Sequence, residues 1–448
     1  MTDSNVVLGT TRFPLARLVW RIRHDSLLRN SLLIMATNAF TAGLGYVYWV
    51  IAARTYLPAE VGLVSAVISA MTLTSLVCNI GFTPALFQML PTRPSVREWS
   101  LTLNTALLVT SVTSLIGALV VILLFYTSPQ FHSMLDSSVF VLAFLASVPL
   151  WTACNLMDAA FQAERASGNV LTRNAALAIL KMVLLIGFIP LHIGGLGIFL
   201  SWLIGCTISL VIAGVLLRRM KREYQFSSNG AIRHARSMVG SLVGHHFTSI
   251  GGALPYYLLP IIVTTRLSAA DNAYFYTTWM LGALFGMISV AVAQSLFAEG
   301  AHAETQLLEN MKRSILLIVV LLAPLMTMYF LFGGVILSVF GKEYPAHSLS
   351  LLYVLTVATV PDAITSVYIS ALRVQKRLRK AAFLNSLMAS IVLVFSWLLL
   401  PTMGISAVGW GWLVSQSVGT GIVAVDFLIT RKTHASLWGK AAIESSAG

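Results

Sequence analysis

The chain is poor in charge and in cysteine. Only 10% of its 448 residues are charged, 57% are hydrophobic, and the mean hydropathy is +0.83. A soluble domain carries about a quarter charged residues, so this composition excludes an ordinary soluble protein and indicates a membrane protein. The three cysteines lie singly inside apolar runs, which argues against a disulfide framework and a zinc site.

The sequence also lacks the marks of an enzyme. It has no glycine-rich loop followed by Lys-Ser or Lys-Thr, the pattern of a site for ATP hydrolysis. It has no paired acidic motif in a loop and no large polar loop to hold an active site. We therefore predict no catalytic residue, no metal and no cofactor.

Long apolar runs, in contrast, fill the chain. A helix needs about 20 apolar residues to cross a bilayer. We predict an all-α polytopic membrane protein with twelve transmembrane helices and both termini in the cytoplasm. The expected spans are 31–53, 61–84, 99–125, 137–158, 173–191, 196–217, 238–262, 272–298, 314–337, 348–372, 381–400 and 405–428.

The positive charges support this topology. With twelve spans, 25 of the 29 Lys and Arg lie on the cytoplasmic side, as expected from the retention of Lys and Arg there during insertion. Only Arg54, Arg266 and Lys342 lie outside, and Lys181 lies within a span. The net charge of +13 is thus explained by topology and by contact with anionic membrane lipids. We predict a cytoplasmic (inner) membrane location and no nucleic-acid partner.

The spans divide into two related halves. We expect a basic cytoplasmic segment at 1–30, a first six-helix lobe at 31–217, a basic linker at 218–237, a second lobe at 238–428 and a cytoplasmic tail at 429–448. The stretch from Ala160 to Asn174 aligns without a gap onto the stretch from Ala371 to Asn385. Six crossings return the chain to the same side, so the repeats would be parallel, related by a pseudo-two-fold axis along the membrane normal.

Two ionisable residues fall at mid-membrane depth. Charged groups there are costly and usually face a cavity. Lys181 follows Arg173 by about 12 Å of helix; it would attract a phosphate or carboxylate of a substrate, or pair with a buried acid. Asp362 in the other half is its candidate partner, and a Lys181–Asp362 contact would lock one conformation.

The seventh span holds His245 and His246 and is rich in Gly and Pro. A histidine at that depth would couple transport to protons, or would simply be hydrogen-bonded in a polar vestibule. Bent spans tend to line a cavity, because their freed backbone groups need partners. The alternative for this span is a packing kink.

Arg54 and Arg266 occupy equivalent external gaps. They would anchor these gaps to Glu60 and Asp271, or contact an anionic substrate as it leaves the cleft.

Several loose motifs together resemble the polysaccharide flippases of the multidrug/oligosaccharidyl-lipid/polysaccharide exporter superfamily. These are the stretch from Ile51 to Gly62, Asn79-Ile80-Gly81-Phe82 with Pro84-Ala85-Leu86, Phe161-Gln162-Ala163-Glu164-Arg165, and Gly194-Gly195-Leu196-Gly197. The twelve-span layout extends the resemblance over about Ser31 to Thr430. The first span lacks the arginines of the peptidoglycan-precursor flippases, which disfavours lipid II as substrate.

The resemblance implies a flippase that carries a polyprenyl-diphosphate-linked oligosaccharide to the outer leaflet by alternating access. Its partners would be the lipid-linked sugar, membrane lipids, and a polysaccharide polymerase or other glycan-assembly proteins. Cavity cations would engage the diphosphate, and Lys181 fits that role best. The alternatives are an H⁺- or Na⁺-coupled drug or metabolite antiporter of the same superfamily and a membrane glycan polymerase or ligase.

Overall fold

The computed structural model describes residues 26–227, 235, 252–300 and 307–444. Every regular element in these ranges is helical, as the sequence predicts. The elements are α2 (Ser26–Thr55), α3 (Pro58–Cys78), α4 (Phe82–Met89), η1 (Leu90–Thr92), α5 (Val96–Phe125), η2 (Pro129–Phe131), α6 (His132–Leu135), α7 (Ser138–Ala163), α8 (Ser167–Phe188), η3 (Ile189–Leu191), α9 (Gly195–Met220), a helical segment over 252–266, α11 (Ala269–Gly300), α12 (Leu307–Ser338), α13 (Tyr344–Val374), α14 (Leu378–Met403) and α15 (Ser406–Glu444).

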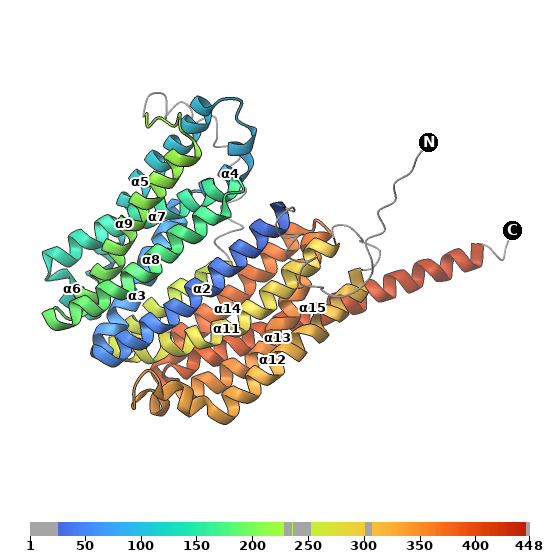
Figure 1. The fold of residues 1–448 in the computed structure, drawn as a ribbon. Coiled ribbons are helices and arrows are strands. Elements are labelled where there is room, and N and C mark those ends of the chain that lie inside the picture. Colours follow the sequence, from blue (N-terminus) through green and yellow to red (C-terminus); the bar gives the residue numbers. More distant parts are fainter. Residues whose placement is uncertain (1–25, 228–234, 236–251, 301–306, 445–448) are drawn as a thin grey trace, which may run out of the picture.

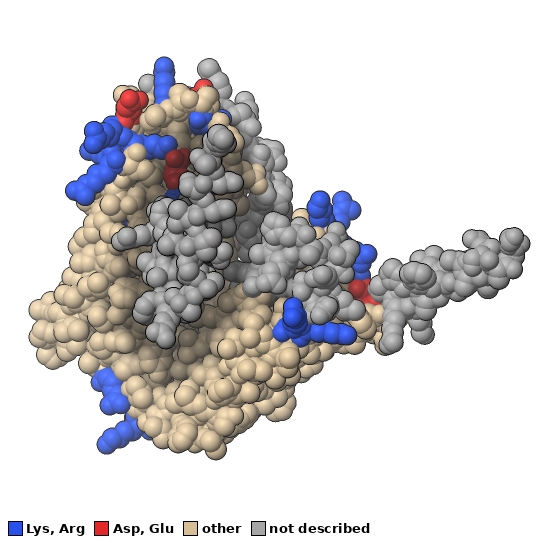
Figure 2. All heavy atoms as spheres, turned by 45° about the vertical axis from the view of Figure 1, so that its right-hand side comes forward, with Lys and Arg blue, Asp and Glu red and all other residues tan. Residues whose placement is uncertain are grey.

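Nine of the described helices are long and apolar enough to cross a membrane. Three of the twelve predicted spans have no counterpart among these nine helices: 31–53, 238–262 and 272–298. The described helices at these positions are α2, the segment 252–266 and α11, respectively. Figure 2 shows charged side chains gathered at the ends of the molecule, with a broad uncharged surface between them. The chain is therefore a multi-pass membrane protein, and the count of twelve crossings stays a prediction.

The helices form two groups that spread apart at one end and converge at the other (Figure 1). In the first group α2 packs on α8, α8 on α9, and α5 on α7. In the second group α11 and α15 both pack on α13. Extensive contact between the groups is made by α3 and α11.

Local chemistry explains the helix ends. Pro58 opens α3, where its missing N–H costs nothing, and Glu60 accepts a hydrogen bond from Leu57 N at 3.1 Å. Ser95 caps α5 by accepting from Glu98 N at 3.2 Å. These caps fix where each helix begins relative to the membrane surface.

The second predicted span is not one continuous helix. It breaks between α3 and α4, where Ile80 and Gly81 take φ values of 49° and 82°. Asn79 stabilises the break, because its Oδ1 accepts from Thr83 N at 2.9 Å. Hydropathy alone missed this break, and the Asn-Ile-Gly triplet was its only signal.

We call the end of the helices that carries Arg93, Arg165 and Lys376 the basic end, and the end that carries Arg54 and Arg266 the opposite end. The two groups of helices converge at the opposite end, where α3 and α11 begin.

Candidate functional site

A cavity of about 480 Å³ lies where the two groups of helices meet, toward the basic end. Its wall combines the α3–α4 break, the second half of α7 and the segment 252–266. The polar and aromatic lining residues are Thr72, Ser75, Asn79, Thr83, Phe87, Trp151, Asn155, Asp158, Gln162 and Tyr257.

An ion pair braces this wall. Arg173 on α8 is only 2% exposed, and its Nε donates to Asp158 Oδ1 at 2.6 Å. Asn174 Nδ2 donates to Asp158 Oδ2 at 3.0 Å. Arg173 Nη1 is buried without a hydrogen-bond partner among the residues described. The Asp158 carboxylate at the cavity wall is therefore already paired with Arg173, and the amide side chains beside it are neutral.

Such a wall suits a sugar better than a bare anion. Aromatic faces stack against the apolar faces of a pyranose ring. Amide groups donate to and accept from its hydroxyls, and a carboxylate accepts from them. Trp151, Tyr257, Asn79, Asn155 and Gln162 supply both kinds of group to one cavity. Sequence reasoning missed this set, because scattered Asn and Gln carry no periodic signal.

Lys181 lies next to the cavity and not in its wall. Its side chain is 8% exposed, and its Nζ sits over the rings of Trp202 at 4.2 Å and Tyr48 at 5.0 Å. Trp202 in turn contacts Trp151, with ring centroids 5.5 Å apart, and Trp151 lines the cavity. Lys181 is thus not among the lining residues of this cavity and is linked to its wall through Trp202 and Trp151. Its role toward a substrate stays a prediction.

Asp362 has a different neighbourhood. It lines a small space of about 30 Å³ together with Tyr256, Trp279, Thr359 and Trp412. Neither Asp362 nor Lys181 belongs to any of the three ion pairs found among the described residues. This conformation therefore does not bring the two predicted partners together.

Arg54 and Arg266, at the opposite end, have other partners than those expected. Arg54 donates to the carbonyl oxygens of Val339 at 2.7 Å and Ser338 at 3.0 Å, at the end of α12. Arg266 stacks on Trp397 at 4.7 Å. The predicted anchoring to Glu60 and Asp271 is wrong, because these acids bind the first turns of their own helices.

Two helices cross closely at the opposite end. An added Cβ on Gly62 of α3 would lie 1.6 Å from Ala269 O on α11. Asn272 Nδ2 donates to Gly62 O at 2.7 Å and to Ser65 Oγ at 3.0 Å. Small residues permit such approaches in membranes, and this crossing holds the two groups of helices together at that end.

His245 and His246 lie outside the described residues. Among the residues described, no group of three or more His, Cys, Asp or Glu could hold a metal ion. The buried Cys154 and Cys206 lie on neighbouring helices, with their sulfur atoms 3.2 Å apart. This contact joins α7 and α9 within the first group of helices.

The fold is that of transporters and flippases of the MOP superfamily. An inward-facing multidrug resistance MATE family transporter matches with a TM-score of 0.64 at 15% identity, over 89% of this chain and 94% of that one. The lipid II flippase MurJ, inward closed, matches with a TM-score of 0.70 at 13% identity, over 87% and 86%. A MOP superfamily transporter from Pyrococcus furiosus matches with a TM-score of 0.59 at 15% identity, over 92% and 96%.

The chain belongs to the polysaccharide biosynthesis protein family, whose family model matches residues 27–297. No curated protein matches it. The predicted resemblance to this group is confirmed.

Proposed function

We propose that the protein moves a lipid-linked oligosaccharide from the cytoplasmic to the external leaflet of the cell membrane. The observation that carries this proposal is the cavity lined by Trp151, Tyr257 and neutral amides. A sugar cannot cross hydrocarbon unaided, because each unsatisfied polar group costs several kcal/mol there, about 4–8 for a hydroxyl or amide transferred to an alkane. A polar cavity between two moving groups of helices lowers that barrier.

We further propose two parallel six-helix lobes, 31–217 and 238–428, joined by the basic linker 218–237, in twelve crossings with cytoplasmic ends at 1–30 and 429–448. Matched backbone turns support the repeat. Arg165 and Lys376 take φ values of 56° and 57° after equivalent helices. Gly194 and Gly404 share φ values of 59° before the last helix of each lobe. The basic end would be cytoplasmic, so the cavity opens inward in this conformation.

The proposed cycle assigns roles to the ionisable groups. The diphosphate would meet Lys181 in a conformation that separates the Trp151 and Trp202 rings, and Arg54 and Arg266 would contact the substrate at the exit. Asp362, with His245 and His246, would bias the two conformations by binding a cation, since a coupling ion must bind them unequally. A polysaccharide polymerase or another glycan-assembly protein would receive the product.

Deleting the gene and fractionating lipid-linked sugars tests the proposal. We expect complete repeat units to accumulate facing the cytoplasm, and wild-type protein to restore export. Trp151→Ala should lower export about tenfold, the effect of losing one ring stack and its buried area, whereas Trp410→Ala on an exposed ring should not. Export of units that stay unpolymerised would instead indicate an enzyme, and unchanged glycans with new sensitivity to cationic drugs would indicate an antiporter.

Lys181→Met separates function from packing. Methionine keeps the apolar stem and a favourable sulfur–ring contact with Trp202 and Tyr48, and it removes a buried charge that lacks an acidic partner among the described residues. We expect the thermal unfolding midpoint to stay the same or rise while export falls about tenfold. Such a gain in stability with a loss of activity is typical when a charge that serves function is removed. Normal export by the variant would remove Lys181 from the proposed cycle.

A further inference from the structure

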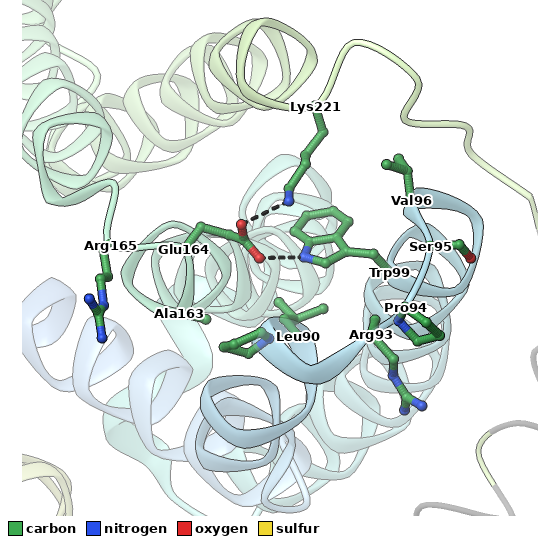
Figure 3. Close-up of a pocket in the computed structure, with 11 residues that line it drawn as sticks. Leu90, Arg93, Pro94, Ser95, Val96, Trp99, Ala163, Glu164, Arg165 and Lys221 are labelled. Carbon is green, nitrogen blue, oxygen red and sulfur yellow. Dashed lines mark hydrogen bonds and ion pairs between the residues drawn. The ribbon is translucent and has the colours of Figure 1, made fainter.

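A second, separate pocket of about 340 Å³ opens at the basic end of the first group of helices. It lies between the α4–α5 connection, the α7–α8 turn and the end of α9. Figure 3 shows Lys221 joined through Glu164 to Trp99, with Arg93 and Arg165 on opposite sides of Leu90 and their guanidinium groups extending away from that group. Three segments thus each contribute one cationic residue to the lining of this pocket.

The single acid in this pocket is already engaged. Glu164 accepts from Trp99 Nε1 at 2.8 Å and pairs with Lys221 Nζ at 2.8 Å. Arg93 and Arg165 form no ion pair among the described residues, and Arg93 Nε is buried without a hydrogen-bond partner there. The pocket lining therefore carries a net charge of about +2, and the charges of Arg93 and Arg165 are not balanced by an acid among the described residues.

The part of the wall next to Lys221 is held by packing and hydrogen bonds. Trp99 is 2% exposed and packs edge-on against Tyr224 at 6.3 Å. Burial raises the pKa of Tyr224, so its hydroxyl stays protonated and donates to Asn104 Oδ1 at 2.6 Å. Asn104 Nδ2 donates in turn to Gln225 O at 2.8 Å. These bonds pin the segment that carries Lys221 against α5.

The backbone at Arg165 takes a φ of 56°, a left-handed value that glycine adopts freely and other residues adopt rarely. Glycine therefore fits this position, so the charge of Arg165 can be removed without straining the turn.

We propose that this pocket binds a phosphate group, from an anionic lipid headgroup or from a soluble phosphorylated ligand. Arginine forks match phosphate oxygens, and the start of α5 adds partial positive charge. The pocket shares no lining residue with the proposed sugar cavity, so the inference does not depend on the transported glycan.

Thermal unfolding of the purified full chain tests the site in two arms. The first arm adds inorganic pyrophosphate to protein in neutral detergent, and the second compares nanodiscs of phosphatidylcholine with and without phosphatidylglycerol. We expect a ligand-dependent rise of the midpoint in at least one arm. A rise with pyrophosphate identifies a soluble phosphate as sufficient, and a rise only with phosphatidylglycerol identifies the headgroup.

Arg165→Gly is the decisive variant, because glycine relaxes the left-handed turn and so leaves folding intact. Lys376→Gly is its matched control, with the same φ and the loss of one cation from the equivalent turn of the other lobe. We expect Arg165→Gly and Arg93→Gln to weaken the apparent affinity about tenfold each, as for lost charge-assisted contacts, and Lys376→Gly to leave it unchanged. No rise in either arm, or an equal loss in Lys376→Gly, would overturn the proposal.

Discussion

Gly62→Ala should abolish export and leave the opposite end of the protein open. The new methyl group would overlap Ala269 O, which an ideal Cβ approaches to 1.6 Å. The backbone of α3 and α11 must then separate, and the bonds from Asn272 to Gly62 O and Ser65 Oγ are lost with the crossing. Each ~1.4 kcal/mol removed from the sealed state shifts the equilibrium tenfold, and an overlap of this size exceeds that.

Thiol labelling from the outside measures this opening. Ser65 is 0% exposed in the sealed conformation, so Ser65→Cys should react slowly with an impermeant maleimide. We expect Gly62→Ala to raise the labelling rate about tenfold or more. Gly187→Ala is the control, because a Cβ there meets no atom within 4 Å. Unchanged labelling together with normal export would show that the α3–α11 crossing is not a gate.

Arg173→Met should be the most destabilising single change in the cavity wall. It leaves the Asp158 carboxylate without its cation, and Arg173 is only 2% exposed. Removing one member of a buried pair costs roughly 3–5 kcal/mol. The exposed pair of Lys380 and Asp426 is the comparison, since Lys380 is 49% exposed, and Lys380→Met should cost at most about 1 kcal/mol.

A double-mutant cycle separates charge from packing. Asp158→Asn removes the carboxylate charge that Arg173→Met leaves unpaired, so the double variant should unfold at a higher temperature than Arg173→Met alone. The measurement is the unfolding midpoint of each purified variant in the same detergent. Equal midpoints for Arg173→Met and Lys380→Met would mean that the cavity wall does not rely on this pair.

The sequence predicted the all-helical fold and most helix positions, because apolar length and the placement of Lys and Arg are local signals. It did not predict the break at Ile80 and Gly81, because hydropathy carries no information on backbone dihedral angles. Nor did it predict the partners of Arg54 and Lys181, which come from helices distant in the sequence. Arg173 pairs with Asp158 on the preceding helix, only 15 residues away, but the sequence does not show that this pair lies at the wall of a cavity.

The Gly62 crossing also bears on the proposed repeat. If the two lobes are copies of one ancestral unit, the register that aligns Asn174 with Asn385 also aligns Gly62 with Ala273, which is buried and has a side chain. Under that proposal two copies of one helix would cross each other, and only one copy would need the glycine, because the other contributes backbone oxygen. Selection would then hold this position fixed in the first lobe and leave the equivalent position in the second lobe free to change.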